Sequence, residues 1–486
     1  MASINSQFVH SPSLKALIFL LLISGLVALI YAISTQNLLI AGIIISLPFI
    51  IFIVGYGLQN PRFVYLLYTT YAFFFTTVSR YIHQDKLSVG LDIILVYLFI
   101  SLLFVSNYPK RKIKLNNAIN ILTVSYIVWI LFTLFQLTNP GIHSDGITVG
   151  VRNWILATFV FYIVASLVSD TPKTLKYGLI VIAIFTIIAF LKLLYQKYAG
   201  FDFAEKYWLY VEGAAGTHIL STGIRYFSYF TDAGNFGTYM GAITIIYFIV
   251  GFNTSNRKFS VFYITIAIMG TVGMLMSGTR SALAVPLVGL ALYCLLCKSI
   301  KIFAISLSIG IILFAFLAFT EIGNGNQFIR RARTAFRPNQ DASFNVRIEN
   351  RKEIAKYLQN HPWGVGLNEN IPKMWQKGDI YVEGTLPPDS YFVSIWIQTG
   401  LWGLILIVFI NIMIISRCCY IVLFNVNNRE LRQTLISFTC AIFGILISGY
   451  TGNSLGQPPT NFLIGAMIAF VMNGAYIDKQ ITQQIQ

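Results

Sequence analysis

Charged residues are scarce in this chain. Asp, Glu, Lys and Arg make up 11% of its 486 residues, whereas hydrophobic residues make up 56%. Because a soluble protein carries roughly 25% charged residues, this deficit excludes an ordinary soluble fold. Apolar runs of about 20 residues, long enough to cross a bilayer, recur from one end of the sequence to the other. We expect an all-α integral membrane protein with about fourteen spans, at residues 15–34, 38–58, 62–79, 89–106, 117–137, 152–169, 174–195, 236–252, 259–276, 280–297, 299–320, 390–416, 432–449 and 459–475.

Acidic residues are scarcer than basic ones: 18 Asp and Glu stand against 34 Lys and Arg, a net charge of +16. Such an excess can indicate nucleic-acid binding, but here it follows the topology of the spans. With the N-terminus inside, short cytoplasmic segments hold sixteen basic residues, and the opposite face holds eight outside its one long loop. This bias predicts two cytoplasmic termini and no nucleic-acid partner. The first run lacks a small-residue cleavage site, so we interpret it as a retained helix.

Cysteine and histidine are also rare, with five of each. By the predicted topology no cysteine lies in an extracytoplasmic loop, which argues against a disulfide framework. The histidines are scattered, without the spacing of a zinc site. The segment 364–366, Gly-Val-Gly, is too short for a nucleotide-binding loop. We therefore expect no metal site and no cofactor.

Two long segments interrupt the series of spans, and both are predicted to face outward. The smaller loop is residues 196–235, and the larger is residues 321–389, 69 residues in all. Eight basic residues lie in the larger loop between positions 330 and 356. Two of them, Arg347 and Arg351, belong to a predicted amphipathic helix that ends at His361-Pro362. Because they are four positions apart, they share one face of that helix.

Arg280 is the charged residue that most needs an explanation. It begins a predicted span directly after a short outward turn, where a charge costs a few kcal/mol by insertion scales. Arg225 lies in the smaller outward loop, so arginines from three parts of the chain meet on one face of the membrane. Guanidinium groups bind phosphate bidentately and stay protonated. The pattern predicts a site for a lipid-linked diphosphate; the alternative is that Arg280 extends to the interface as a simple anchor.

Four stretches of the sequence resemble the bacterial O-antigen ligase/polymerase family, and they occur along the chain in the same order as in that family. "MSGTRSALAVPLVGL" resembles its Ser-Gly-(Ser/Thr)-Arg helix start, and "NVRIENRKEIAKYLQNHPWGVGLN" resembles its Arg-containing helix with a Pro-φ-Gly-φ-Gly turn. "PPDSYFVSIWIQTGLWGLIL" is similar to the segment that closes its large periplasmic loop. "GIRYFSYFTDAGNFGTYMG" is similar to the stretch in its earlier periplasmic loop. Together they cover residues 223–403, while the first 200 residues match only as membrane helices.

The resemblance implies a glycosyltransferase of the GT-C-like class in the bacterial inner membrane, with its site on the periplasmic face. The donor would be an undecaprenyl-diphosphate-linked glycan. Ligase members pass the glycan to lipid A-core, and polymerase members pass it to another lipid-linked repeat unit. In both, periplasmic arginines are thought to hold the donor diphosphate, a role that transfers to Arg225, Arg280 and Arg347. Other implied partners are the glycan acceptor, membrane lipids and a chain-length regulator protein.

One departure from the family pattern favours the polymerase over the ligase. Ligases usually carry a His, their proposed base, where this chain has Pro388-Asp389-Ser390. Asp389 can serve as a base or orient the acceptor hydroxyl. It can equally cap the helix that follows. The ligase remains the alternative within the family.

Five further residues are candidates for contact with substrate. Ser277 belongs to the Ser-Gly-Thr-Arg motif, and Arg351 shares the face of Arg347. Asp232 and Asn235 follow Arg225 and can orient it, bind sugar or cap the next helix; Glu212 is a second candidate base. Two functions of another class are the alternatives. A transporter that flips lipid-linked oligosaccharides would place charges along a path through the membrane. A structural subunit would not need Arg280.

Overall fold

The computed structural model describes residues 50–83, 85–106, 117–143, 146–150, 152–220, 223–297, 300–334, 342–377 and 380–485. Two compact units can be distinguished: residues 1–64 with 97–112, and residues 65–96 with 113–486. The predicted span 15–34 and most of 38–58 lie outside the described ranges. All candidate site residues lie in the second unit.

The first unit contains the helix Ile50–Gln59 and parts of two longer helices that continue into the second unit, α4 (Pro61–Ile82) and α5 (Val89–Ser106). Ser101 donates from Oγ to the carbonyl of Gly57 at 2.6 Å. A Cβ atom at Gly57 would lie 2.2 Å from the Tyr97 hydroxyl. Glycine therefore permits the close approach of the two segments at this point.

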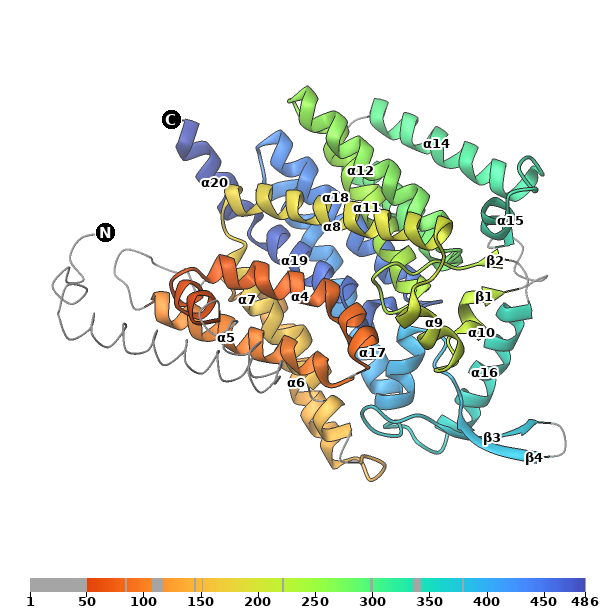
Figure 1. Ribbon diagram of the computed structural model, residues 1–486. Coiled ribbons are helices and arrows are strands. Elements are labelled where there is room, and N and C mark those ends of the chain that lie inside the picture. The colour runs from red at the N-terminus through yellow and green to blue at the C-terminus, as the bar shows by residue number, and fades with distance from the viewer. Residues whose placement is uncertain are drawn as a thin grey trace, which may run out of the picture. The chain divides into compact units, whose positions relative to one another are not determined.

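The second unit is built almost entirely of helices (Figure 1). Its membrane-type helices are α6 (Ile121–Phe135), α7 (Phe161–Val168), α8 (Pro172–Tyr198), α11 (Ala233–Asn253), α12 (Arg257–Met276), α13 (Arg280–Leu296), α14 (Ile300–Phe319), α17 (Tyr391–Tyr420), α18 (Arg429–Ser448), α19 (Thr460–Met472) and α20 (Gly474–Ile485). Between them lie α9 (Phe203–Tyr210), α10 (Ala215–His218), α15 (Gln327–Thr334) and α16 (Ala342–Leu358). Two short antiparallel hairpins pair β1 (Ile219–Leu220) with β2 (Gly223–Ile224) and β3 (Pro372–Lys377) with β4 (Ile380–Thr385).

The described helices confirm an all-α membrane fold. Eight of them are long and apolar enough to cross a membrane, or nine if α19 and α20, bent by 55°, form one span. The predicted count of fourteen is not confirmed. The predicted spans 89–106 and 259–276 agree with α5 and α12 to within two residues. The predicted span 280–297 is α13, which has only 17 residues and contains Pro286.

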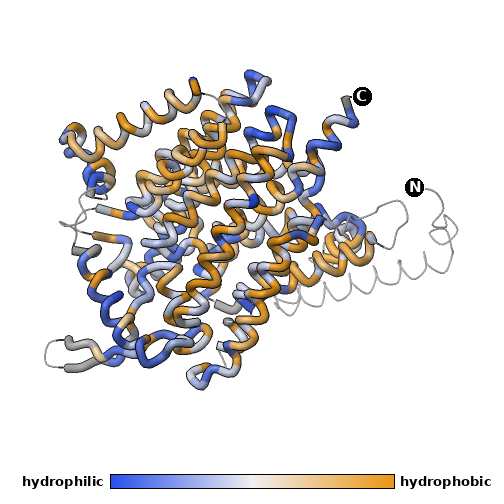
Figure 2. Tube along the Cα trace, turned by 180° about the vertical axis from the view of Figure 1, so that it is seen from behind, coloured by the Kyte–Doolittle hydropathy of each residue, from blue (hydrophilic) through white to orange (hydrophobic). Residues whose placement is uncertain are grey.

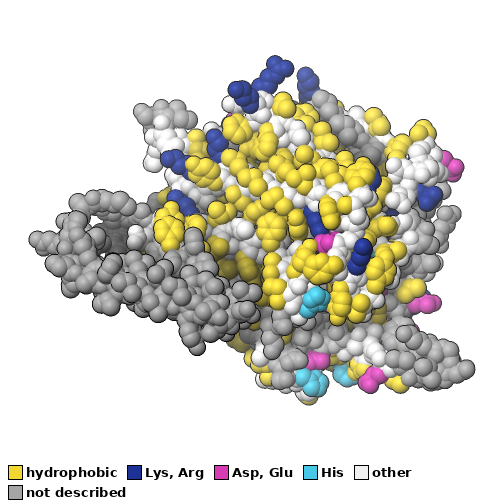
Figure 3. All heavy atoms as spheres, in the orientation of Figure 1, with side chains coloured by type: hydrophobic (Ala, Val, Ile, Leu, Met, Phe, Trp, Pro, Cys, Tyr) yellow, Lys and Arg dark blue, Asp and Glu magenta, His cyan; other side chains and the backbone are white. Residues whose placement is uncertain are grey.

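The distribution of polarity matches a protein that spans a membrane. Figure 2 shows apolar residues along most of the helices and hydrophilic residues mainly at helix ends and in connections. On the face shown in Figure 3, hydrophobic side chains predominate, Lys and Arg gather along the upper edge, and His side chains lie toward the lower edge. A multi-pass membrane protein is thus supported by composition and by structure.

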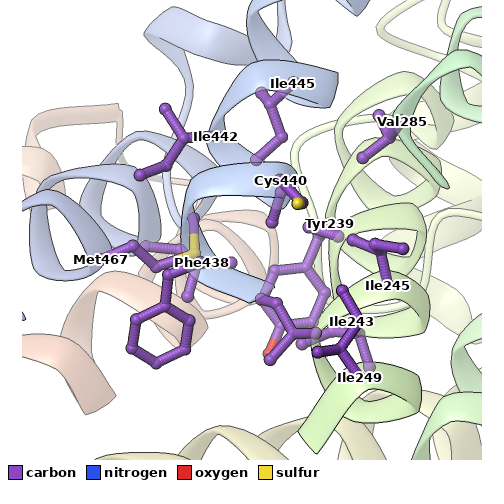
Figure 4. Packing of buried hydrophobic residues seen from close by; sticks show 14 of the residues in the cluster. Tyr239, Ile243, Ile245, Ile249, Val285, Phe438, Cys440, Ile442, Ile445 and Met467 are labelled. Atoms are coloured by element: carbon purple, nitrogen blue, oxygen red, sulfur yellow. The ribbon is translucent and has the colours of Figure 1, made fainter. Parts of the chain in front are cut away.

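The core forms around α11 and α18, which are the most deeply buried of the membrane-type helices. Tyr239 and Ile243 of α11 pack near Phe438 and Cys440 of α18, with Val285 of α13 beside them (Figure 4). Small residues bring these backbones together. A Cβ at Gly444 of α18 would lie 2.3 Å from the carbonyl oxygen of Val285. The beginning of α13, which carries Arg280, is therefore held against the best-packed part of the protein.

Replacing Gly444 by alanine should lower the melting temperature of the detergent-solubilised protein. The added methyl group meets backbone, which cannot move aside, and overpacking of this kind costs about 1–3 kcal/mol. Gly178→Ala on α8 is the matched control, because the nearest atoms to its Cβ, on Phe470, are at an ordinary 3.6 Å. Equal melting temperatures for the two variants would contradict the tight α13–α18 contact.

Candidate active site

The turn between α12 and α13 shapes the centre of the candidate site. Ser277 is completely buried; its Oγ donates to the carbonyl of Met274 (2.7 Å) and accepts from the Thr279 amide (3.1 Å). Gly278 has φ +58°, a conformation that favours glycine. Arg280 then begins α13. Ser277 thus fixes the turn from inside the fold, and the expectation that it contacts substrate is not supported by its burial.

Two other arginines pack against this turn. A Cβ added to Gly278 would lie 3.1 Å from Cδ of Arg331 and 3.4 Å from Cγ of Arg225. Arg225 donates from Nη2 to Thr279 Oγ1 (3.0 Å) and from Nη1 to the carbonyl of Thr217 (2.9 Å). Arg225 and Arg331 therefore meet beside Arg280, from the segment after β2 and from α15.

The arginines influence one another electrostatically. Burial, together with the positive charges of Arg225 and Arg280, lowers the pKa of Arg331 to about 10. Burial also lowers the pKa of Arg225; Asp232 opposes this shift, while Arg280 and Arg347 add to it. Like charges disfavour each other's ionised state. A bound anion would relieve this repulsion, so the cluster is suited to a multiply charged group such as a diphosphate.

The hairpin before Arg225 is anchored by a neutral histidine. Burial lowers the pKa of His218 to about 4. Its Nε2 accepts from the amide of Ala233 at the start of α11 (3.2 Å), and its carbonyl accepts from the Arg225 amide (2.8 Å). His218 thereby ties the arginine to the core helix. This is a positioning role that the sequence did not indicate.

Helix α16 brings a second group of polar side chains to the site. Arg347 donates to the carbonyl of Thr451 (2.9 Å), and Arg351 donates to the carbonyl of Tyr450 (2.8 Å) and lies over the Tyr450 ring. A Cβ at Gly452 would lie 3.3 Å from Ser281 Oγ. The turn after α18 therefore touches both α16 and the start of α13, which places Arg347 and Arg280 around one centre.

Asp389 belongs to the same centre. Its Oδ2 accepts from Nδ2 of Asn350, which is buried one turn from Arg347 on α16 (3.2 Å). The cap of α17 is Ser390, whose Oγ accepts from the amide of Val393 (3.3 Å). The interpretation of Asp389 as the helix cap is therefore wrong. Its carboxylate is half-buried and is joined through Asn350 to α16, the helix that carries Arg347 and Arg351.

Residues 264–408 match a family model described as O-antigen ligase. This match confirms the resemblance for the three motifs that it contains, while the stretch 223–241 lies outside it. It includes Arg280, Arg331, Arg347 and Asp389, whereas Arg225 lies outside it. A search of curated proteins finds no match to the chain. The O-antigen ligase family consists of glycosyltransferase-like membrane enzymes. Most residues of the candidate site lie in the part of the chain that matches this family.

The remaining candidates fall into structural positions. Asp232 caps α11, accepting from the amides of Gly234 and Asn235 (3.0 Å to the latter). Asn235 is completely buried; its amide donates to Thr231 Oγ1 and the Pro458 carbonyl and accepts from the Thr460 hydroxyl. This burial and these hydrogen bonds do not support the prediction that Asn235 binds sugar. Asp232 still contributes a negative charge near Arg225.

Glu212 does not join this arrangement. It lies exposed in the turn after α9, and in the part of the chain that the structure describes no hydrogen bond or ion pair joins its carboxylate to the arginines. Asp389 is therefore the better candidate base. Within the described ranges, no group of three or more His, Cys, Asp or Glu side chains could hold a metal ion.

Arg331 and Asn350, like His218, are not predicted from the sequence. The large loop is predicted to be basic, but nothing in the sequence distinguishes Arg330, Arg331 and Arg333 from one another. On α15, Arg330 is exposed, Arg331 contacts the Gly278 turn, and Arg333 is buried and bound to Asn324, Thr320 and the Ile322 carbonyl. Only the orientation of this short helix separates the three roles.

Asn235→Ala tests whether Asn235 is structural. The change leaves the Thr460 hydroxyl and the Pro458 carbonyl buried without their partner, which costs about 1–3 kcal/mol, so the melting temperature should fall clearly. The KM of the folded fraction for its substrate should stay the same. A raised KM at an unchanged melting temperature would return Asn235 to the substrate site.

Proposed function

We propose that this protein polymerises lipid-diphosphate-linked polysaccharide repeat units of the O-antigen or capsule type, at the periplasmic face of the bacterial inner membrane. The observation that carries the proposal is the meeting of Arg225, Arg280 and Arg331 around the Gly278 turn, at the end of an apolar helix. A lipid carrier would lie with its tail beside the helices and its diphosphate among the guanidinium groups. The charge bias predicts that both termini are cytoplasmic.

The reaction would be a direct displacement at the anomeric carbon of the donor. The acceptor hydroxyl oxygen attacks this carbon, its proton passes to the Asp389 carboxylate, and the bond to the diphosphate oxygen breaks with its electron pair. Negative charge grows on the leaving diphosphate, so arginines held in place beforehand stabilise the transition state more than the ground state. The energy comes from the glycosyl–diphosphate bond that breaks, and no nucleotide sugar is required.

Ligase activity is the second candidate, because the matching family model is described as O-antigen ligase. Against it stands the segment Pro388-Asp389-Ser390 in place of the His that ligases use. The position of Asp389 beside Asn350 supplies a carboxylate where the ligases have an imidazole. This supports the polymerase as first choice.

A transporter fits the embedded charges less well. Lys192 at the end of α8 is paired with Asp202 (2.7 Å) and Glu205 (3.0 Å). Asp92 of α5 is paired with Arg152. Both charges, which lie within the predicted spans 174–195 and 89–106, are therefore neutralised locally. Neither supports a charged path through the membrane.

Surface glycan from a chromosomal deletion strain tests the proposal. Single repeat units attached to lipid A-core in the deletion strain, with a restored ladder on complementation, would support polymerisation. Full-length glycan that stays on the carrier lipid, with none on the core, would instead establish the ligase. Lipid-linked repeat units confined to the cytoplasmic leaflet would establish a transporter.

A further inference from the structure

A second open site lies on the Asp389 side of the arginines. It is a cavity of about 540 Å³, within the range of about 300–1,000 Å³ that is usual for small-molecule sites. Its wall is formed by α5, the π-helical segment Arg152–Val160, the loop after α16, the first turns of α17 and the segment 453–462.

The cavity is polar but close to electrically neutral. Six side-chain amides line it: Asn153, Asn368, Asn370, Gln398, Asn453 and Asn461. Its charged lining residues in the described ranges, Asp92 and Arg152, are paired with each other. This contrasts with the arginine site, which is strongly cationic. The cavity is therefore poorly suited to a diphosphate and well suited to an uncharged polar ligand.

Three of the amides are available to a ligand. The side chains of Asn153, Asn370 and Asn453 are exposed to the cavity and make no hydrogen bond to another described part of the chain. A side-chain amide both donates and accepts hydrogen bonds, as a sugar hydroxyl does, so the two groups can form hydrogen bonds in both directions. Aromatic rings of Trp154 and Tyr391 also line the wall. Such rings offer an apolar face to the C–H side of a sugar ring.

The cavity and the arginine site share their boundary. Pro388 lines the cavity and is followed directly by Asp389. Tyr391, also in the wall, donates its amide to the Gly452 carbonyl (3.0 Å), in the same turn whose Thr451 carbonyl accepts from Arg347. A saccharide in the cavity would thus have Asp389 at its edge and the diphosphate site beyond.

We propose that this cavity binds the uncharged saccharide of the acceptor repeat unit, with the reacting hydroxyl directed toward Asp389. That the bound saccharide is the acceptor rests on the proposed polymerase function. Its binding to the cavity can be measured without turnover. It assigns the two substrates to two chemically different sites: the donor is held by charge at its diphosphate, and the acceptor by hydrogen bonds and ring contacts at its sugar.

The test uses the full-length protein in nanodiscs and the lipid-free oligosaccharide of one repeat unit, released from the strain's own lipid-linked precursor. Binding is measured by titration calorimetry. Gly456→Leu should weaken binding by more than about tenfold, because the nearest atoms to a Cβ there are at 3.9 Å and the side chain would extend into the cavity. Asn453→Ala should weaken it by about tenfold through a lost hydrogen bond.

Two controls make the result decisive. Gly216→Leu on α10, where no atom lies within 4 Å of an added Cβ, should bind the oligosaccharide as the wild type does. Arg280→Ala should also bind it normally, since the cavity does not include Arg280. Wild-type protein that fails to bind the oligosaccharide, or Gly456→Leu that binds it normally, would overturn the cavity proposal while leaving the polymerase intact. A normal polysaccharide ladder from Arg280→Ala would overturn the polymerase mechanism without touching the binding result.

Discussion

Arg280→Ala should reduce polymer formation by about 10²–10³-fold, the usual effect of removing one preorganised group that stabilises charge in the transition state. Arg280 begins α13 directly after the Gly278 turn, against which Arg225 and Arg331 pack. Its loss removes one third of this cluster, at the point where charge develops on the leaving diphosphate. The effect should fall mainly on kcat with lipid-linked single repeat units as substrate.

Arg280→Lys and Arg330→Ala complete this experiment. Lysine keeps the charge but not the planar fork that binds phosphate bidentately, so it should restore only part of the rate. Arg330 is exposed and adjacent to Arg331 on α15, so Arg330→Ala should leave the rate close to wild type. Arg280→Ala protein that reaches the membrane at normal levels and makes a normal ladder would show that Arg280 is only an interface anchor.

Asp389→Asn should lower kcat by about 10²–10⁴-fold, the range typical of general-base catalysis. The amide keeps the shape of the carboxylate and can still accept from Asn350, so the fold around α16 and α17 should persist. The measurement is the kcat of the wild type and of the variant with lipid-linked single repeat units as substrate.

Ser390→Ala separates catalysis from capping. Ser390, not Asp389, caps α17, so this variant should lose about 1 kcal/mol of stability and keep its kcat. Asp389→Asn with a kcat within about threefold of wild type would remove Asp389 from the mechanism, because even weak general-base help exceeds that factor.

The membrane character and the convergence of Arg225, Arg280 and Arg347 could be predicted from the sequence. The apolar runs predicted the bounds of helices α5 and α12 to within two residues. Loop charges predicted the orientation, and the predicted orientation placed the arginines on one face of the membrane. This reasoning works because lipid imposes strong, local constraints on composition and length.

The rest depended on tertiary packing. The cap of α17 is Ser390 and not Asp389, and the Asp389 carboxylate instead accepts from Asn350 of α16. The sequence places Asn235 close to a polar loop. However, α11 enters the core in its first turn and buries the Asn235 side chain. Arg152, the partner of Asp92, is 60 positions away, so periodicity could not reveal the pair or the neutral cavity beside it.

Reconstitution of the purified protein with a fluorescent lipid-diphosphate-linked single repeat unit tests the central claim most directly. The account predicts a ladder of longer glycans that remain on the carrier lipid, formed without nucleotide sugar and abolished by Arg280→Ala. No elongation from repeat units alone, together with transfer to added lipid A-core, would contradict the polymerase and establish the ligase.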